Sequence, residues 1–326
     1  MSDQQSEVRT PFPGYQQGQE LQLQFTAPGQ PTRQIAATIL RVKEPFTCSV
    51  ALVVGMILNN NPEVFFLKLY DHRFSHGMRA QFEIGPYTPE IATAFNNFVQ
   101  TGGADAFGLH LTGQVHLPGV EGSEFTPEQD EIFVTKNLDG LYLSEVGAYD
   151  GLQASQGVSI PRFMGTCVLD ATPPGYDSHE YFQIEGIVTQ FLPGFSLEDL
   201  PHYAPRGLWQ EIVDAAVAVT REVDAADMLN MDTRPDNFIV VPHLEGGFFK
   251  TYMIDLAMCV RRREGQTDEQ WGREKWWRNE EGCVGEAMQH ILSQHDFELR
   301  FERSDKYDAY AHLAEAEEDG DGVEAE

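Results

Sequence analysis

The sequence MLNMDTRPDNFIVV, Met228–Val241, is the stretch on which our expectation of the fold rests. After a short loop that contains Gly246-Gly247, the chain continues as TYMIDLA, Thr251–Ala257. The apolar runs FIVV and TYMI, separated by this loop, are typical of a β-hairpin. Polar side chains flank both runs: Asp232, Asp236 and Asn237 precede the first, and Asp255 follows the second.

Two interpretations of these polar residues are open. Carboxylate and amide oxygens are hard ligands that suit Mg²⁺, and a hairpin would bring Asn237 and Asp255 to the same end of its strands. Alternatively, Asp232 and Asp236 are turn formers around Pro235, because Asp and Pro are common turn residues. The first interpretation predicts a site for a metal and a phosphate, and the second predicts only the end of a strand.

Length, composition and charge limit the kinds of protein that this chain can be. The chain has 326 residues, enough for one large domain or two lobes, and 41% of them are hydrophobic, which permits a sizeable core. The formal net charge is −29 at pH 7. Nucleic acids and anionic membranes are polyanions whose binding requires Lys and Arg, so we expect neither as a partner.

We expect a soluble cytoplasmic protein, with the nucleus as the alternative compartment. Residues 1–20 contain no apolar segment of the kind that a secretory signal requires. The longest apolar run, Cys48–Leu58, is shorter than the ~20 residues needed to cross a bilayer. The 4 cysteines are widely spaced without a C-x-x-C pair, which favours reduced thiols over a zinc site or disulfides.

Composition also divides the chain into segments. Residues 1–35 are rich in Gln, Pro and Gly and predict a mobile arm, whereas the acidic residues 314–326 predict a disordered tail. Three apolar, β-branched runs predict an antiparallel sheet at the start of the fold: QIAATILRV, CSVALVVGMIL and PEVFFLKLY.

Residues 71–136 are polar and Gly-rich and have the character of an insertion. They contain one predicted helix, TPEIATAFNNFVQ, which Thr88 can cap and on which Ile91, Phe95 and Phe98 share a face. The insertion therefore separates the predicted sheet from the elements that follow.

Helices and strands alternate after the insertion. The spacing of apolar residues predicts a helix over 137–154, then strands in VSIPRFMGTCVL and YFQIEGIVTQFL. A clear amphipathic helix over 206–229 leads into the stretch quoted first, and a last helix is predicted near GEAMQHIL.

This order of elements, with the D-x-x-x-x-N spacing from Asp232 to Asn237 and the later Asp255, resembles the protein-kinase-like superfamily. The chain is similar in particular to the divergent fungal protein-kinase-domain-containing proteins, through LKLYD-RF, GVSIPRFMG and D-x-RPDNFIV. The resemblance covers roughly residues 39–255. It implies an α+β, two-lobed kinase-like fold with a small antiparallel-sheet N-lobe and a reduced helical C-lobe.

The resemblance also implies the domain boundaries. Residues 36–190 would form the N-lobe with the insertion at 71–136, and residues 191–313 would form the C-lobe. A hinge near Gln190–Gly194 would join them, because a strand there runs into a Pro-Gly turn and a capped helix start. The adenine of ATP would lie against the hinge, which makes Gln190 and Phe191 candidate nucleotide-binding residues.

Catalytic roles follow from the same resemblance. Lys68 would bind the α- and β-phosphates of ATP, and Glu145 would pair with Lys68. Asp232 would accept the proton of the acceptor hydroxyl, and Arg234 would stand near the transferring phosphate. The implied activity is an ATP-dependent kinase, which transfers a phosphoryl group to an alcohol of unknown identity, small molecule or protein.

Magnesium would be the second cofactor. Asn237 and Asp255 stand where the resemblance implies the two Mg²⁺ ligands, and both would also contact the nucleotide through the metal. Phosphoryl transfer concentrates negative charge on the phosphate oxygens, so a protein supplies mainly positioning, metal ions and cationic groups.

Other interpretations of single residues stay open. Lys68 in an apolar strand is typical of an edge strand that is protected from aggregation, and Glu145 is typical of a solvated helix face. The expected place between the first two strands contains no G-x-G-x-x-G, and no A-P-E follows Asp255. These departures favour the alternative function, a pseudokinase that acts as a binding or scaffolding module without catalysis.

Overall fold

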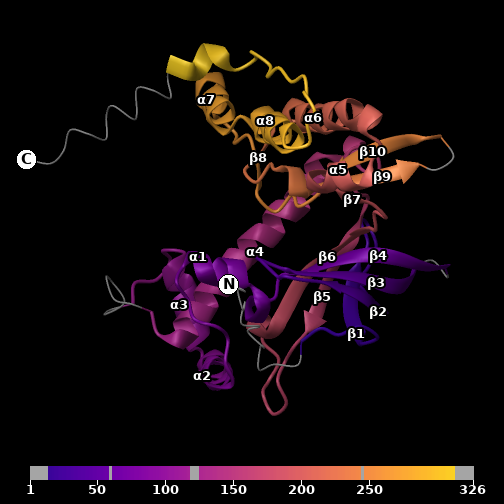
Figure 1. The fold of residues 1–326 in the computed structure, drawn as a ribbon. Helices are drawn as coiled ribbons and strands as arrows, with labels where there is room; N and C mark the ends of the chain where they lie inside the picture. The colour runs from indigo at the N-terminus through magenta and orange to yellow at the C-terminus, as the bar shows by residue number, and fades with distance from the viewer. Residues whose placement is uncertain (1–13, 59–60, 118–124, 244–245, 313–326) are drawn as a thin grey trace, which may run out of the picture. The chain divides into compact units, whose positions relative to one another are not determined.

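The computed structural model describes residues 14–58, 61–117, 125–243 and 246–312. The chain divides into two compact units, each described here by itself (Figure 1). Unit 1 comprises Met1–Tyr142 and Phe163–Phe191, and unit 2 comprises Leu143–Arg162 and Leu192–Glu326. The predicted boundary at 190/191 lies next to this division, but residues 143–162, placed in the first domain from sequence, belong to unit 2. The predicted acidic tail lies outside the described residues.

A closed barrel of antiparallel strands forms the centre of unit 1 (Figure 1). The strand order is β1-β2-β3-β4-β6-β5, and pairing between β1 and β5 closes the barrel. The strands are β1 (Glu20–Thr26), β2 (Arg33–Lys43), β3 (Val50–Leu58), β4 (Asn61–Leu69), β5 (Phe163–Asp170) and β6 (Gln183–Gln190). Closure pairs the strands that would otherwise be the edges of the sheet.

The predicted fold class is therefore wrong. The sequence predicts a two-lobed kinase-like fold with a small antiparallel sheet and a reduced helical lobe, whereas the observed sheet is a closed barrel. The strand that closes it, β1, lies within the segment predicted to be a mobile arm. Leu21, Leu23 and Phe25 of this strand are buried in the barrel core, while the alternating Gln22 and Gln24 are exposed. Period-two alternation is the mark of a half-buried strand, and the Gln-rich composition of the exposed face obscured it.

The predicted insertion is more helical than the sequence indicates. It contains the 3₁₀ turn η1 (His72–Phe74), α1 (His76–Gln81), α2 (Pro89–Gln100), α3 (Gly103–Leu111) and the start of α4 (Pro127–Gly151). The prediction of α2 is confirmed, and the Thr88 hydroxyl accepts a hydrogen bond from the Ile91 amide at 3.3 Å. Its buried face consists of Ala92, Phe95 and Val99, so the predicted face is displaced by about one residue.

Two buried carboxylates lie beside the barrel in unit 1. Glu131 of α4 is fully buried and accepts hydrogen bonds from the Arg79 guanidinium at 2.9 and 2.6 Å and from His72 Nδ1 at 2.8 Å. Asp71, also fully buried, accepts hydrogen bonds from Arg73 Nε at 2.8 Å and Nη2 at 2.6 Å. Buried charges are tolerated when paired in this way. The contacts of His72 and Arg79 with Glu131 fix η1 and α1 against α4.

The described residues of unit 2 contain two small sheets, the four helices α5 to α8 and the C-terminal part of α4 (Figure 1). The sheets have the orders β10-β9-β7 and β11-β8. The strands are β7 (Phe195–Ser196), β8 (Met228–Asn230), β9 (Phe238–His243), β10 (Phe248–Met253) and β11 (Cys259–Arg261), and the helices are α5 (Leu200–Tyr203), α6 (Trp209–Ala225), α7 (Asp268–Arg278) and α8 (Glu280–Ser293). The predicted hairpin is confirmed, because β9 and β10 pair with Phe238 opposite Met253.

The short connecting turns of the chain are η2 (Gln153–Ser155), η3 (Glu180–Phe182), η4 (Leu197–Asp199), η5 (Arg206–Leu208), η6 (Pro235–Asn237) and η7 (Asp308–Tyr310). The helix predicted over 206–229 is shorter in the structure, since α6 ends at Ala225 and the last residues of the prediction form β8. In the described part of the chain, no helix combines the length and the apolar character needed to span a membrane.

The first prediction concerns the closing strand. Phe25 is 1% exposed in the barrel core, so replacing it with Ala removes apolar contacts and leaves a cavity. We expect Phe25→Ala to lower the free energy of unfolding by about 3–5 kcal/mol in urea titrations. The neighbouring exposed Gln24→Ala is the control, with an expected change within about 0.5 kcal/mol. Equal effects of the two variants would show that β1 is not part of the core.

The second prediction concerns acid stability. Burial alone would raise the pKa of Glu131, but the hydrogen bonds and charges of His72 and Arg79 lower it below its usual 4.5. A carboxyl group whose pKa is lower in the folded state stabilises that state above its unfolded-state pKa, and the stabilisation is lost as the pH falls through the folded pKa. The pKa of Asp71 behaves in the same way: burial would raise it, but Arg73 lowers it below 3.8. We expect the free energy of unfolding to decrease progressively below pH 4.5.

Urea titrations between pH 6 and pH 3 would measure this decrease. Glu131→Gln removes one of the two responsible groups and is expected to give a flatter curve from a lower starting value. Glu128→Gln, three residues earlier on α4, should keep the wild-type shape. A Glu131→Gln curve as steep as that of the wild type would contradict the assignment.

Candidate functional site

The candidate site of unit 2 lies at the open end of the β9–β10 hairpin. The backbone carbonyl of Asn237, just before β9, accepts a hydrogen bond from the Ile254 amide at 2.8 Å, just after β10. Asp255 directly follows Ile254. The hairpin therefore places Asn237 and Asp255 at the same end, as their positions in the sequence predict.

Asn237 also holds the candidate base, Asp232. The side-chain nitrogen of Asn237, Nδ2, donates one hydrogen bond to the main-chain oxygen of Asp232 at 2.8 Å and another to the Asp232 carboxylate at 2.9 Å. The Asn237 amide oxygen is consequently directed away from Asp232. The 3₁₀ turn η6 lies between Asp232 and β9, and in it the backbone amide of Asn237 donates a hydrogen bond to the Arg234 carbonyl at 3.0 Å. The predicted turn is thus present, and it orients the carboxylate as well.

The backbone at Asp255 is unusual. Asp255 has φ +56°, in the left-handed region that non-glycine residues rarely adopt. The following residue is anchored, because the Leu256 amide donates to Glu145 Oε1 at 3.3 Å. Strained backbone that is held by its surroundings is concentrated at functional sites. Glu145 is 2% exposed, so the interpretation as a solvated helix residue is wrong.

Arg234 is the cationic residue of this loop. Its Nε lies 3.3 Å from Asp232 Oδ1 and 3.2 Å from Asp236 Oδ1. The Arg234 side chain is 53% exposed and that of Asp232 is 30% exposed, so both groups are accessible to a ligand. Exposed ion pairs of this kind contribute little to stability, which favours a role other than holding the fold.

Lys68 lies in β4 of unit 1 and is 7% exposed. It stands opposite Ala51 of β3 and Ile187 of β6, so β4 has a neighbour on both sides. The interpretation as a protected edge strand is therefore wrong. The ammonium group lies 5.5 Å from the centre of the Tyr70 ring, a cation–π contact. Its predicted pairing with Glu145 of unit 2 stays a prediction.

The two candidate adenine-binding residues end the last barrel strand. Gln190 is the final residue of β6, opposite Phe65 of β4, and Phe191 directly follows. The Arg41 guanidinium lies 5.9 Å from the centre of the Phe191 ring. Both side chains are half-buried, and their role in nucleotide binding stays a prediction.

A buried group that the sequence did not reveal supports the candidate base. Glu280, at the start of α8, accepts a hydrogen bond from the Asn230 amide at 2.7 Å and pairs with Lys275 of α7 at 2.6 Å. Asn230 is fully buried, and its side-chain oxygen accepts a hydrogen bond from the Asp232 amide at 2.9 Å. Lys275 also donates to the Met228 carbonyl. A continuous chain of contacts therefore runs from α7 and α8 to Asp232.

Sequence spacing gave no signal for this ion pair. Lys275 and Glu280 are five residues apart on two different helices, because α7 ends at Arg278 and α8 begins at Glu280. The i,i+3 and i,i+4 rules for helical ion pairs do not reach across such a break. The sequence assigns no role to Asn230, whereas the structure gives it a supporting role.

The donor set at the hairpin end fits Mg²⁺ as a partly protein-bound ion. The Asp255 carboxylate and the Asn237 amide oxygen are hard ligands, and Mg²⁺ in nucleotide sites usually keeps several waters and phosphate oxygens. Within the described residues, no group of three or more His, Cys, Asp or Glu side chains is placed to hold a metal ion. The protein would thus supply only part of the coordination shell.

Comparison with known proteins assigns no family to the chain. No protein-family model matches the sequence, and no curated protein is significantly similar to it. The kinase resemblance stays an expectation from motifs, and the functional argument depends on the geometry of the site.

The third prediction concerns the Lys275–Glu280 pair. Lys275 is 1% exposed in its side chain, and its loss would leave the buried Glu280 carboxylate without its cation. We expect Lys275→Met to lower the free energy of unfolding by about 3–5 kcal/mol, measured in urea. Arg221→Gln breaks the more exposed pair with Glu281 and serves as the control, with an expected loss of at most about 1 kcal/mol. Similar losses in both variants would show that the buried Lys275–Glu280 pair contributes no more to the free energy of unfolding than the exposed pair does.

Proposed function

We propose that unit 2 carries the reactive residues of an ATP- and Mg²⁺-dependent phosphotransferase whose acceptor is an alcohol. The observation that supports this most is the double hydrogen bond from Asn237 to Asp232, at the hairpin end that also carries Asp255. The proposal concerns the chemistry of this site and does not include a kinase-like fold. The proposed setting is the cytoplasm.

In this proposal Asp232 is the general base. A base has to be held within hydrogen-bonding reach of the proton that it accepts. Asn237 fixes the Asp232 carboxylate, and Asn230 fixes its backbone amide, while the side chain remains 30% exposed. An acceptor hydroxyl can approach the exposed part of the carboxylate and transfer its proton there.

The remaining polar residues have proposed roles in binding phosphate. Arg234, beside Asp232, would offer a cation to the transferring phosphate. Mg²⁺ held by Asn237 and Asp255 would neutralise phosphate charge when bound. Glu145 holds the backbone after Asp255 and in this way positions that carboxylate.

A binding or scaffolding module without catalysis is the second candidate function. The observation that favours it is the double ion pair of Arg234, which occupies the Asp232 and Asp236 carboxylates with a cation from their own loop. This candidate predicts a partner bound by the surface of the chain and no turnover of ATP.

The fourth prediction separates the two candidates. ATP that binds only the folded state raises its stability, by about 2.7 kcal/mol at a hundred times the Kd. We expect a Mg²⁺-dependent rise in the Tm of the wild type that Asp255→Asn abolishes. Asp232→Asn should keep the rise in Tm but reduce phosphoryl transfer, or ATP hydrolysis in place of an acceptor, by about 10²–10⁴-fold.

Asp236→Asn is the matched control, because Asp236 lies in the same turn and contacts Arg234 but has no proposed role. It should retain both the ATP-dependent rise in Tm and the turnover. If nucleotide gave no shift in any variant, or if Asp232→Asn turned over ATP as fast as the wild type, the phosphotransferase assignment would be wrong.

A further inference from the structure

Unit 1 contains a pocket of about 310 Å³ that the proposed function does not use. Its walls come from η1, from α2 and from the connection between β5 and β6. Small-molecule pockets in proteins typically measure about 300–1,000 Å³. The pocket is therefore large enough for a small ligand.

The walls of this pocket are mostly apolar and are firmly packed. Phe95 of α2 is 1% exposed, Tyr181 is 5% exposed and Phe182 is 4% exposed. The three belong to one buried cluster with residues of α2, α3 and α4. Such walls suit a flat apolar or aromatic group.

Arg73 is the charged side chain of this pocket's wall. His72 and Arg73 line it, and none of the described residues that line it is Asp or Glu. The formal net charge of the chain is −29, so a pocket without carboxylates in its wall stands out from the rest of the surface. An anionic group would find its favourable partners here.

Buried carboxylates orient both basic residues. Arg73 uses Nε and Nη2 to bind Asp71, and this carboxylate holds the guanidinium at the wall of the pocket. The lowered pKa of Glu131, which His72 and Arg79 cause against the effect of burial, keeps this carboxylate ionised. An ionised carboxylate only accepts, so the proton of the Glu131–His72 hydrogen bond lies on His72 Nδ1.

The phenol of Tyr87 adds a neutral polar group to the same wall. Burial, together with the charge of Glu131, raises the pKa of Tyr87 well above its usual value. The hydroxyl therefore stays protonated and brings no negative charge into the pocket.

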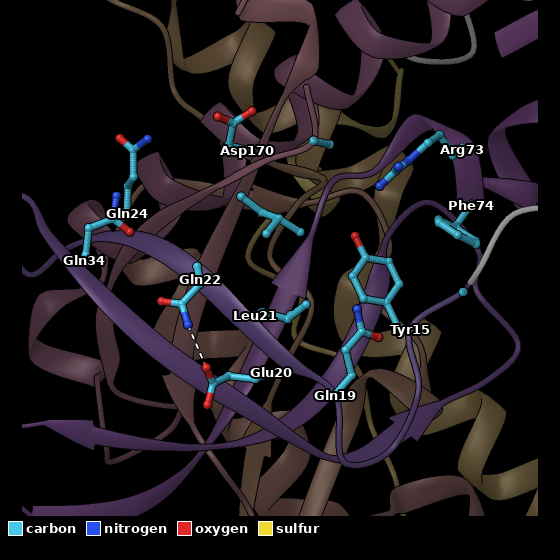
Figure 2. Close-up of a pocket in the computed structure, with 13 residues that line it drawn as sticks. Tyr15, Gln19, Glu20, Leu21, Gln22, Gln24, Gln34, Arg73, Phe74 and Asp170 are labelled. Atoms are coloured by element: carbon cyan, nitrogen blue, oxygen red, sulfur yellow. Dashed lines mark hydrogen bonds between the residues drawn. The ribbon is translucent and has the colours of Figure 1, made fainter. Parts of the chain in front are cut away.

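A second, larger pocket in unit 1 provides a contrast (Figure 2). It measures about 470 Å³, and Arg73 lines it as well. Figure 2 shows Arg73 near Tyr15, while Glu20 and Asp170 stand at other parts of the wall. Its lining includes the exposed glutamines Gln22 and Gln24 of β1 and Gln34 of β2, and its two carboxylates, Glu20 and Asp170, oppose an anion. The smaller pocket is the better site for a negative charge.

We propose that the smaller pocket binds a small organic anion. Its carboxylate or similar acidic group would meet Arg73, and its flat apolar body would lie among Phe95, Tyr181 and Phe182. The proposal gives the predicted insertion a ligand-binding role, and it is independent of the phosphotransferase activity proposed for unit 2.

Benzoate is a suitable probe, with benzyl alcohol and benzylamine as its neutral and cationic analogues. Titration followed by ligand-observed NMR should show saturable binding of benzoate to the wild type with a Kd of about 10 mM or lower. Benzyl alcohol and benzylamine should bind at least about tenfold more weakly, because neither carries a negative charge that can pair with the Arg73 guanidinium. Arg73→Gln should weaken benzoate binding by about tenfold or more.

Three further variants keep the test decisive, since Arg73→Gln also removes the partner of Asp71. Asn96→Phe places a ring in the pocket from α2 without changing either basic residue and should abolish binding. Thr93→Phe, at an exposed position of the same helix outside the pocket, should bind as the wild type does. Asp170→Asn, in the larger pocket, should also leave the affinity unchanged.

Three results would overturn the proposal. The first is the absence of saturable benzoate binding to the wild type at concentrations well above 10 mM. The second is equal affinity for benzoate and benzyl alcohol, which would show that no cation is involved. The third is an effect of Thr93→Phe or Asp170→Asn as large as that of Asn96→Phe or Arg73→Gln. Circular dichroism of each variant would establish that it is folded.

Discussion

A carboxylate that is removed from water has to be paired, and this constraint organises both units. In unit 1, Glu131 is paired with Arg79 and His72 beside the barrel. In unit 2, Glu280 is paired with Lys275 and with the Asn230 amide. Each pairing joins segments that are distant in sequence, so each fixes local geometry that local propensity alone would leave open. The candidate base of unit 2 and the proposed anion pocket of unit 1 both lie next to such a pairing.

The candidate site of unit 2 illustrates how little sequence is needed to build a reactive arrangement. One hairpin brings Asn237 and the residue before Asp255 into backbone contact, and one turn lets Asn237 hold Asp232. Glu280 of α8 supports that turn, because it binds the backbone amide of Asn230, whose side chain in turn binds the backbone amide of Asp232. A mechanism that relies on positioned carboxylates requires such support, since misplacement by a fraction of an ångström weakens catalysis. The support comes from buried charge, whereas the reacting groups stay accessible.

Prediction from sequence succeeded where a local pattern is sufficient. The FIVV–TYMI hairpin and helix α2 with its Thr88 cap depend on turn residues, capping and periodicity within a few positions, and the structure confirms them. It failed at β1, whose Leu–Gln alternation was outweighed by a Gln-rich composition, and the predicted open sheet of a kinase-like lobe proved to be a closed barrel. Closure depends on pairing between β1 and β5, which lie far apart in sequence and carry no local signal of it.

The sequence by itself determined the hairpin and the order of Asp232, Asn237 and Asp255 along it, because turn chemistry and strand alternation act over short distances. Only the tertiary structure decided that the barrel closes and that the Lys275–Glu280 pair supports the candidate base through Asn230. It also decided that His72 and Arg73 share an apolar pocket. These features depend on which buried surfaces and charges meet, and burial is a property of the packed molecule that no short stretch of sequence specifies.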